Sequence, residues 1–246
     1  MSDTASFPSF AFDRRFEMPL IDSEASALAY SPVSNRLYTI SDEPAFIVEF
    51  TTGGRKARRI ELEGFEDTEG LTHLHGNLFA VAEERLCRIS IIEISPERDV
   101  AIVKSRRRLN IPVKGNKGIE GITYDAATDT LHVGREYPTT VFQVHPFLGR
   151  GGRSIKETEL NLSEIDDLSD IFFDPSGPWL WTLSHESKRA LVFDDSGNCV
   201  GELSFKKGGS GLKKTVKQAE GIVRDSRGRL FICSEPDLVY RFKAEN

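Results

Sequence analysis

The sequence of 246 residues lacks the features of several protein classes. It contains only three cysteines, an odd number in strand-like runs, which indicates buried thiols and argues against a disulfide framework or a metal knuckle. No apolar run approaches the ~18 residues of a membrane span, so we expect no transmembrane segment. The first residues show no charged region followed by an apolar one. No signal peptide is therefore visible, and the cytoplasm is the default expectation.

Positive charge is also scarce. The chain has 32 Lys and Arg against 38 Asp and Glu, which gives a net charge of −6. Proteins that read nucleic acid usually carry a basic stripe, so we expect no nucleic-acid partner. The chain has neither a phosphate loop ending in Gly-Lys-Ser/Thr nor a nucleophile elbow. Its composition, 39% hydrophobic and 28% charged, is that of an ordinary globular protein.

The sequence does contain a repeated pattern of an acidic or hydroxyl anchor, a small residue and an apolar residue. The clearest copies are Glu69-Gly70-Leu71, Glu120-Gly121-Ile122 and Glu220-Gly221-Ile222, and looser copies begin at Ser26 and Ser169. The five anchors are 43, 51, 49 and 51 residues apart. A period of this length indicates stacked supersecondary units. Because the copies cover nearly the whole chain, we expect residues 1–246 to form a single domain.

Each unit predicts a four-stranded antiparallel sheet, because short β-branched and aromatic runs alternate with turns rich in Gly, Pro, Asn and Asp. The fifth unit ends before its fourth strand, and residues 10–20 resemble the fourth strand of the first unit. We therefore predict an all-β, five-bladed β-propeller with first strands that start near residues 26, 69, 120, 169 and 220. The N-terminal strand joins the last blade and closes the ring. Only residues 163–170 indicate a helical turn.

Antiparallel order places the anchors on one face, around the central channel. The oxygen-bearing side chains at or two residues before the anchors are Glu69, Glu120, Glu220, Glu24, Asp67, Asp167, Ser26 and Ser169. At ~5 Å and an effective dielectric near 20, each pair of like charges costs about 3 kcal/mol. A bound cation relieves that repulsion, and oxygen ligands without paired His or Cys favour Ca²⁺. We predict a calcium ion held by these carboxylates, with the serine hydroxyls as further ligands.

A second rim of acidic residues follows the second strand of each unit. Its members are Glu43, Glu84, Glu136, Glu186 and Glu235. One residue type repeated in every unit is typical of a structural device, in which each carboxylate accepts backbone N–H bonds from a neighbouring loop. The alternative is that these glutamates bind a ligand, and the sequence leaves both interpretations open.

Two long basic connections lie on the same face, one with Lys114 and Lys117 and the other with Lys213 and Lys217. We interpret them as flexible solvated loops. The alternative is an anion pocket above the cation, suited to a carboxylate or phosphate. Among the five histidines, only His185 is expected beside the acidic rim. A hydrogen-bonded loop histidine is the simpler interpretation there, and a catalytic base is the alternative.

Several stretches resemble the SdiA-regulated, or YjiK-like, family of bacterial β-propeller proteins. They are residues 41–50, 183–187, 217–222 and 234–236, and the resemblance covers nearly the whole chain. It implies a five-bladed propeller with a calcium site, distantly similar to NHL repeats and without an established activity. Members often carry an N-terminal membrane anchor or export segment, which implies a periplasmic or membrane-associated location instead of the cytoplasm.

Three functions are consistent with these patterns. The first is a calcium-containing propeller that binds or senses a small anionic ligand. The second is a calcium-dependent hydrolase of a lactone, ester or phosphoester, by fold-level analogy with six-bladed enzymes. It would need an open coordination position beside a base such as His185. The third is a protein-interaction platform, which predicts an exposed apolar patch. The ligand and the oligomeric state are not encoded in any pattern that we find.

Overall fold

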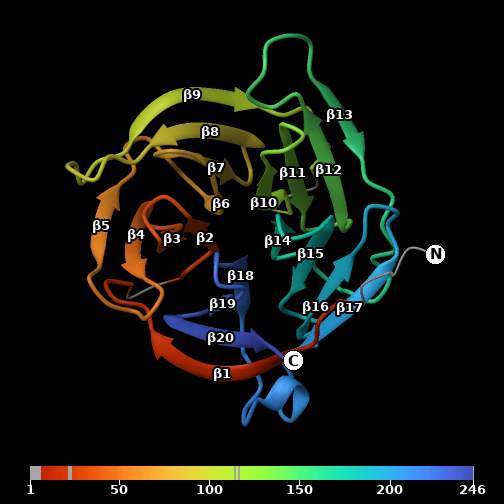
Figure 1. Ribbon diagram of the computed structural model, residues 1–246. Helices are drawn as coiled ribbons and strands as arrows, with labels where there is room; N and C mark the ends of the chain where they lie inside the picture. Colours follow the sequence, from red (N-terminus) through yellow and green to blue (C-terminus); the bar gives the residue numbers. More distant parts are fainter. Residues whose placement is uncertain (1–6, 22–23, 114, 116, 246) are drawn as a thin grey trace.

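The computed structural model describes residues 7–21, 24–113, 115 and 117–245. It shows five sheets, each of four antiparallel strands, arranged around a central axis (Figure 1). The chain is therefore a five-bladed β-propeller, as the repeat predicts. None of the helical segments in the described part of the chain has the length and apolar character that a membrane crossing requires.

The strands of the first four blades follow chain order from the axis to the rim. Blade 1 contains β2 (Ala27–Ser31), β3 (Arg36–Ser41), β4 (Phe46–Thr51) and β5 (Arg58–Glu61). Blade 2 contains β6 (Thr68–His75), β7 (Leu78–Glu83), β8 (Arg88–Glu93) and β9 (Ile102–Arg108). Blade 3 contains β10 (Ile119–Asp125), β11 (Thr130–Arg135), β12 (Thr140–His145) and β13 (Ser154–Glu157). Blade 4 contains β14 (Asp170–Asp174), β15 (Trp179–Ser184), β16 (Arg189–Phe193) and β17 (Cys199–Ser204).

Blade 5 is built from both ends of the chain. It contains β18 (Ala219–Arg224), β19 (Leu230–Ser234) and β20 (Leu238–Ala244), and its outermost strand is β1 (Phe10–Glu17). β1 pairs antiparallel with β20 along its whole length, from Phe10 opposite Ala244 to Glu17 opposite Leu238. Asp13 reinforces the pairing, because its carboxylate accepts a 2.6 Å bond from Arg241 and lies 2.8 Å from the Lys243 ammonium. The predicted closure by the N-terminal strand is confirmed.

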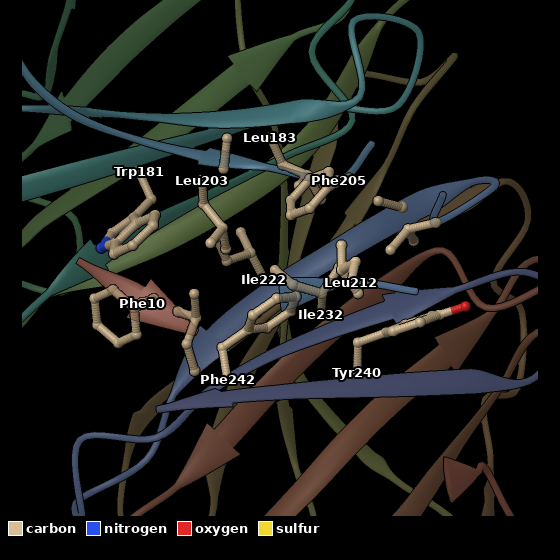
Figure 2. Close-up of a cluster of buried hydrophobic side chains, with 14 of the residues drawn as sticks. Phe10, Trp181, Leu183, Leu203, Phe205, Leu212, Ile222, Ile232, Tyr240 and Phe242 are labelled. Carbon is tan, nitrogen blue, oxygen red and sulfur yellow. The ribbon is translucent and has the colours of Figure 1, made fainter. Parts of the chain in front are cut away.

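The apolar core lies between the blades, in five clusters that each join two neighbouring sheets. The cluster between blades 4 and 5 contains Trp181, Phe242 and Phe10 of the closing strand (Figure 2). Phe10 is only 5% exposed, and its ring stands edge-on to Trp181 with the centroids 5.6 Å apart. The N-terminal strand thus contributes packing as well as backbone hydrogen bonds to the ring.

Near the axis, neighbouring blades meet through their backbones. A Cβ atom on Gly121 would lie less than 3.0 Å from the backbone nitrogen of Ile171, and a Cβ atom on Gly221 would lie as close to that of Leu28. Only glycine permits this approach. Blade 4 has Asp170 at the corresponding place. The buried carboxylate of Asp170 accepts 2.8 Å bonds from the N–H groups of Ile171 and Ile222, and so links blade 4 to blade 5.

The helical turn is not where the sequence indicates it. Residues 163–169 form a turn and a bend without a helix, whereas the described part of the chain has one short 3₁₀ turn, η1 (Gly209–Gly211). η1 lies in the glycine-rich connection between blades 4 and 5, beside β1 and β17. Glycine-rich sequence carries little helical propensity, which explains why the pattern does not reveal this turn.

The closing strand should carry a large share of the stability. Replacing Phe10 by alanine removes a buried ring between two blades, and we expect it to lower the free energy of unfolding by about 3–5 kcal/mol. Val103, which is 38% exposed on the outer strand β9, provides a matched control, and Val103→Ala should cost less than about 0.5 kcal/mol. Urea denaturation of both variants measures the difference. Equal, small effects would show that β1 does not belong to the cooperative core.

Candidate functional site

The channel glutamates are residues of β-bulges. The pairing of β6 with β7 shifts register between Thr68 and Gly70, which leaves Glu69 without a residue opposite it. The same kind of shift brackets Glu120 in β10 and Glu220 in β18. A bulge redirects a side chain out of the regular alternation of the strand. Three of the five blades thus present a glutamate at the inner edge of the sheet.

Blades 1 and 4 lack this bulge and have serine anchors. Ser26 and Ser169 come directly before the first strand, and their N–H groups bond to the carbonyls of Ile40 and Leu183 at 3.0 and 2.9 Å. The Ser26 side chain counteracts the rise in the pKa of Glu69, and the Ser169 side chain that of Glu220. Each serine therefore lies close enough to a channel glutamate to share a site with it.

The register of the second strands differs from the sequence-based alignment in two blades. The residue that directly follows the second strand is Asp42, Glu84, Glu136, His185 or Glu235 in blades 1 to 5. Glu43 and Glu186 lie one residue further along, are exposed, and do not occupy the position equivalent to Glu84. The sequence-based alignment matched glutamates with one another. In the structure, the equivalent position in each blade is the residue that directly follows the second strand. A binding or structural role for Glu43 and Glu186 stays a prediction.

Two groups of carboxylates converge on this face. The first contains Asp42, Asp67 and Glu69 from blades 1 and 2, and the second contains Glu84, Glu120 and Glu136 from blades 2 and 3. Within each group, one carboxylate oxygen of every residue lies within 4.8 Å of those of the other two. The sequence pattern separates the anchors and the second rim into two sets. In the structure, each cluster contains residues from both the anchor region and the end of a second strand. Asp42 was not among the predicted ligands, and only its place after β3 could have indicated it.

Burial and mutual repulsion raise the pKa values of Glu69, Glu84 and Glu120. Burial, together with the charge of Asp42, raises the pKa of Glu69 to about 8. Burial, together with nearby carboxylates that include Glu136, raises the pKa of Glu84 to about 7. The pKa of Glu120 lies well above its usual value because of burial and the charges of Glu69 and Glu136. The mouth of the channel therefore gathers carboxyl groups whose ionised forms the surrounding protein solvates poorly.

Each cluster has one cation at its edge. Arg85 forms an ion pair with Asp67 and donates its backbone N–H to the same carboxylate at 2.7 Å. These bonds hold the pKa of Asp67 below its usual value despite the opposing effect of burial. Lys117 lies 2.7 Å from Glu136. Both cations are about half exposed, at 51% and 49%, and each forms an ion pair with one of the three carboxylates in its cluster.

Between blades 4 and 5 a histidine takes the place of the third carboxylate. The Nδ1 atom of His185 lies 2.8 Å from the carboxylate of Asp167, 3.2 Å from the Ser169 hydroxyl and 3.6 Å from Glu220. Hydrogen bonds from His185 and Ser184 lower the pKa of Asp167 to about 2, against the effect of burial. The bond to Asp167 raises the pKa of His185. At this part of the mouth, the imidazole of His185 is the protein group that offsets the negative charge of Asp167.

The remaining predicted residues lie at the periphery. Glu24 is exposed, and its charge together with burial raises the pKa of Glu235. Lys213 and Lys217 are exposed, and the Lys188 ammonium bonds to the carbonyl oxygen of Lys217. Lys114 lies outside the described residues.

The opposite end of the channel has a different chemistry. A cavity of about 1230 Å³ is lined there by the hairpins that join the first and second strands of all five blades. Its wall is largely apolar, with Leu71, Ile122, Ile171 and Ile222. His73 also lines this cavity, in agreement with its predicted location on the far face. This cavity and the acidic clusters therefore lie at opposite ends of the axis.

Comparison with solved structures returns proteins of propeller shape at low sequence identity. A Myxococcus xanthus glutaminyl cyclase matches with a TM-score of 0.66 and 13% identity over 96% of this chain and 97% of that one. A luciferin-regenerating enzyme matches with a TM-score of 0.59 and 8% identity over 97% and 96% of the two chains. A chain of a nidogen/laminin complex matches with a TM-score of 0.57 and 14% identity over 92% and 84%. At such identities the likeness shows the fold alone.

The sequence itself gives a closer assignment. The model of the SdiA-regulated family matches residues 5–243, which is nearly the whole chain. This span includes all five blades and the strand that closes the ring. The protein belongs to the SdiA-regulated family.

Proposed function

We propose that the chain binds a calcium ion at the channel mouth, in the cluster of Glu84, Glu120 and Glu136. The observation that carries the proposal is the convergence of these three carboxylates, from two blades, to within 4.8 Å of one another. The donor set consists only of oxygens, which hard cations prefer, and Ca²⁺ takes six to eight such ligands at about 2.3–2.6 Å. Backbone carbonyls, serine hydroxyls and water would complete the shell.

The charge balance favours this cluster over its neighbour. In the cluster of Asp42, Asp67 and Glu69, Asp67 is already committed to two bonds from Arg85. In the cluster of Glu84, Glu120 and Glu136, the protein cation Lys117 contacts only Glu136, and Glu84 accepts one backbone bond from Gly118 at 2.7 Å. Glu120 has no basic partner among the described residues. A divalent ion would offset the repulsion that raises the pKa of Glu120 and Glu84.

The proposed role of the ion is to present a coordination position to a small anionic ligand. A carboxylate or phosphate oxygen can replace a water on a calcium ion whose protein ligands come from one side. Lys213 and Lys217 belong to the connection that leads into β18, and their exposed ammonium groups would favour the approach of an anion. On this proposal the propeller binds or senses a small acid at its acidic mouth.

A second candidate is hydrolysis of a lactone, ester or phosphoester, and the arrangement around His185 favours it. The Nδ1 atom of His185 faces Asp167, and no bond to its Nε2 atom is found within the described residues. A carboxylate that orients a histidine while the other ring nitrogen remains available is the usual arrangement of a general base. The glutaminyl cyclase and the luciferin-regenerating enzyme share the fold, which raises this candidate only by analogy.

Calcium should stabilise the protein. At a calcium concentration one hundred times Kd, binding to the native state alone contributes about 2.7 kcal/mol, which corresponds to a rise in Tm of about 5–10 °C for a chain of this size. The measurement is a thermal melt in chelator and then in excess CaCl₂. Mg²⁺ should give a smaller rise because it requires a tighter octahedral shell.

Glu120→Gln should abolish the calcium-dependent rise in Tm. Glu61→Gln serves as the matched control, because Glu61 lies on the outer strand β5, is half exposed and pairs with Arg59. The control should respond to calcium as the unchanged protein does. A chain whose Tm is the same in chelator and in calcium would contradict the calcium site.

The metal-free protein should lose stability as pH rises from about 5 to 8. In this window the unfolded chain has ionised carboxyls with ordinary pKa near 4.5, whereas Glu69 with a pKa of about 8 and Glu84 with about 7 still hold protons in the folded state. Unfolding then releases protons, so stability falls with pH by at most about 1.4 kcal/mol per unit for each group. Urea denaturation in chelator at four pH values measures the slope, and Glu69→Gln should flatten it. A slope identical in both proteins would refute the raised pKa of Glu69.

The hydrolase candidate predicts turnover that depends on both the ion and the histidine. A panel of lactones, esters and phosphoesters is assayed with the unchanged protein, with Glu120→Gln and with His185→Gln in the presence of calcium. Loss of at least 100-fold in kcat for both variants would support it, since general-base catalysis contributes about 10²–10⁴-fold. Binding of calcium without turnover of any compound would leave the binding function and reject the hydrolase.

A further inference from the structure

Within the part of the chain that the structure describes, one buried arginine has no acidic partner. Of the two buried arginines in the described part of the chain, Arg241 pairs with Asp13, whereas Arg135 at the end of β11 forms no ion pair. Arg135 is 7% exposed. A guanidinium cannot lose its proton in a protein, so the charge stays in place at this depth. Burying a charge without an opposite charge is unfavourable.

The contacts of Arg135 are all with neutral groups. Its Nε donates to the carbonyl of Pro138 at 3.0 Å, Nη1 to the carbonyl of Pro112 at 2.9 Å, and Nη2 to the hydroxyl of Thr140 at 2.8 Å. The Phe142 ring lies against the guanidinium, 5.2 Å from its central carbon. A guanidinium has five N–H donors, so two of them are left for a further acceptor.

The neighbouring blade shows which group is missing. Glu83 occupies the last position of β7, as Arg135 does in β11, and it forms a buried ion pair with Arg88 across the strand pair, with Nε–Oε2 at 2.6 Å. In blade 3 the residue opposite Arg135 is Thr140. Blade 3 thus has a buried charge of the opposite sign at this position, and the residue across from it carries no charge to balance it.

The space beside Arg135 is open. A cavity of about 480 Å³ is lined by Asn110, Pro112, Arg135, Phe142, Ile155 and Glu157. Pockets for small organic molecules begin at about 300 Å³, so this volume exceeds what a single ion needs. Phe142 and Ile155 provide apolar walls, and the exposed Asn110 and Glu157 lie at the solvent side.

We propose that this cavity binds the oxyanion group of a small organic acid, a carboxylate or a phosphate, on the guanidinium of Arg135. The two remaining donors, one on Nη1 and one on Nη2, are available to an oxyanion, since a guanidinium can give two N–H bonds to one carboxylate or phosphate, and the apolar part of the acid packs against Phe142 and Ile155. Glu157 is the opposing charge at the cavity, and it weakens anion binding. The site does not depend on calcium at the channel mouth.

The test uses benzoate and phenyl phosphate, which carry the two oxyanions on the same apolar ring. Isothermal titration calorimetry in chelator should show saturable binding of at least one probe to the unchanged chain, and the tighter probe identifies the preferred oxyanion. Arg135→Gln should weaken binding at least tenfold. Arg135→Lys keeps the charge but loses the planar guanidinium, so its affinity should lie between those of the unchanged chain and Arg135→Gln. Arg189→Gln, a change at the first position of the third strand in blade 4, should leave the affinity unchanged.

Glu157→Gln provides a variant that does not alter the buried cation. Because Glu157 is exposed, the substitution should preserve the fold, and removal of its negative charge should tighten binding severalfold. Unchanged affinity in Glu157→Gln would overturn the proposal even if Arg135→Gln fails to fold. Absence of saturable binding of both probes would overturn it too, as would wild-type affinity in folded Arg135→Gln. A loss of stability in Glu157→Gln equal to that in Arg135→Gln would show that Glu157 is the internal counter-ion and that no ligand is needed.

Discussion

The close backbone contact between the innermost strands determines most of what this molecule can do. Gly121 and Gly221 allow the backbones of adjacent blades to touch, and Asp170 replaces that contact in blade 4 with two hydrogen bonds from its carboxylate. Because the strands meet without side chains between them, the channel mouth is narrow and the residue before each glycine faces its counterparts on other blades. A glutamate at that position therefore lies close to other carboxylates. The fold itself produces this repulsion between like charges, which a cation would relieve.

The protein relieves this repulsion unequally around the ring. Between blades 4 and 5, His185 stands between Asp167 and Glu220 and supplies positive charge from within the chain. Between blades 2 and 3, Lys117 approaches only the outer member of the cluster, and Glu120 faces other carboxylates. A propeller with pseudo-fivefold symmetry thus has a chemically polarised mouth, with a histidine-bearing side and a carboxylate-bearing side. The histidine and the carboxylate cluster of Glu84, Glu120 and Glu136 thus lie on different sides of one axis.

The architecture can be read from the sequence because it repeats. Five copies of one pattern fix the number of blades, and the first strands begin within one residue of the predicted positions. The match between the N-terminal segment and a fourth strand predicts the closure. The details of the site are less accessible, because they depend on register. Asp42 and His185 take positions that a search for glutamate assigns to Glu43 and Glu186. The exceptional position of Arg135 emerges only when its strand partner Thr140 is compared with Arg88 in the blade before.

The bulges at Glu69, Glu120 and Glu220 are the local feature that places glutamates at the channel mouth. Each bulge is one additional residue at the inner edge of a sheet. The pairing beyond it is regular in β10 and β18, whereas β6 has a second shift between His73 and His75. Because each bulge is a local feature of the inner strand pair, glutamate-type and serine-type blades have the same four-stranded sheet. The same scaffold therefore presents a glutamate at the pore in three blades and a serine in the other two.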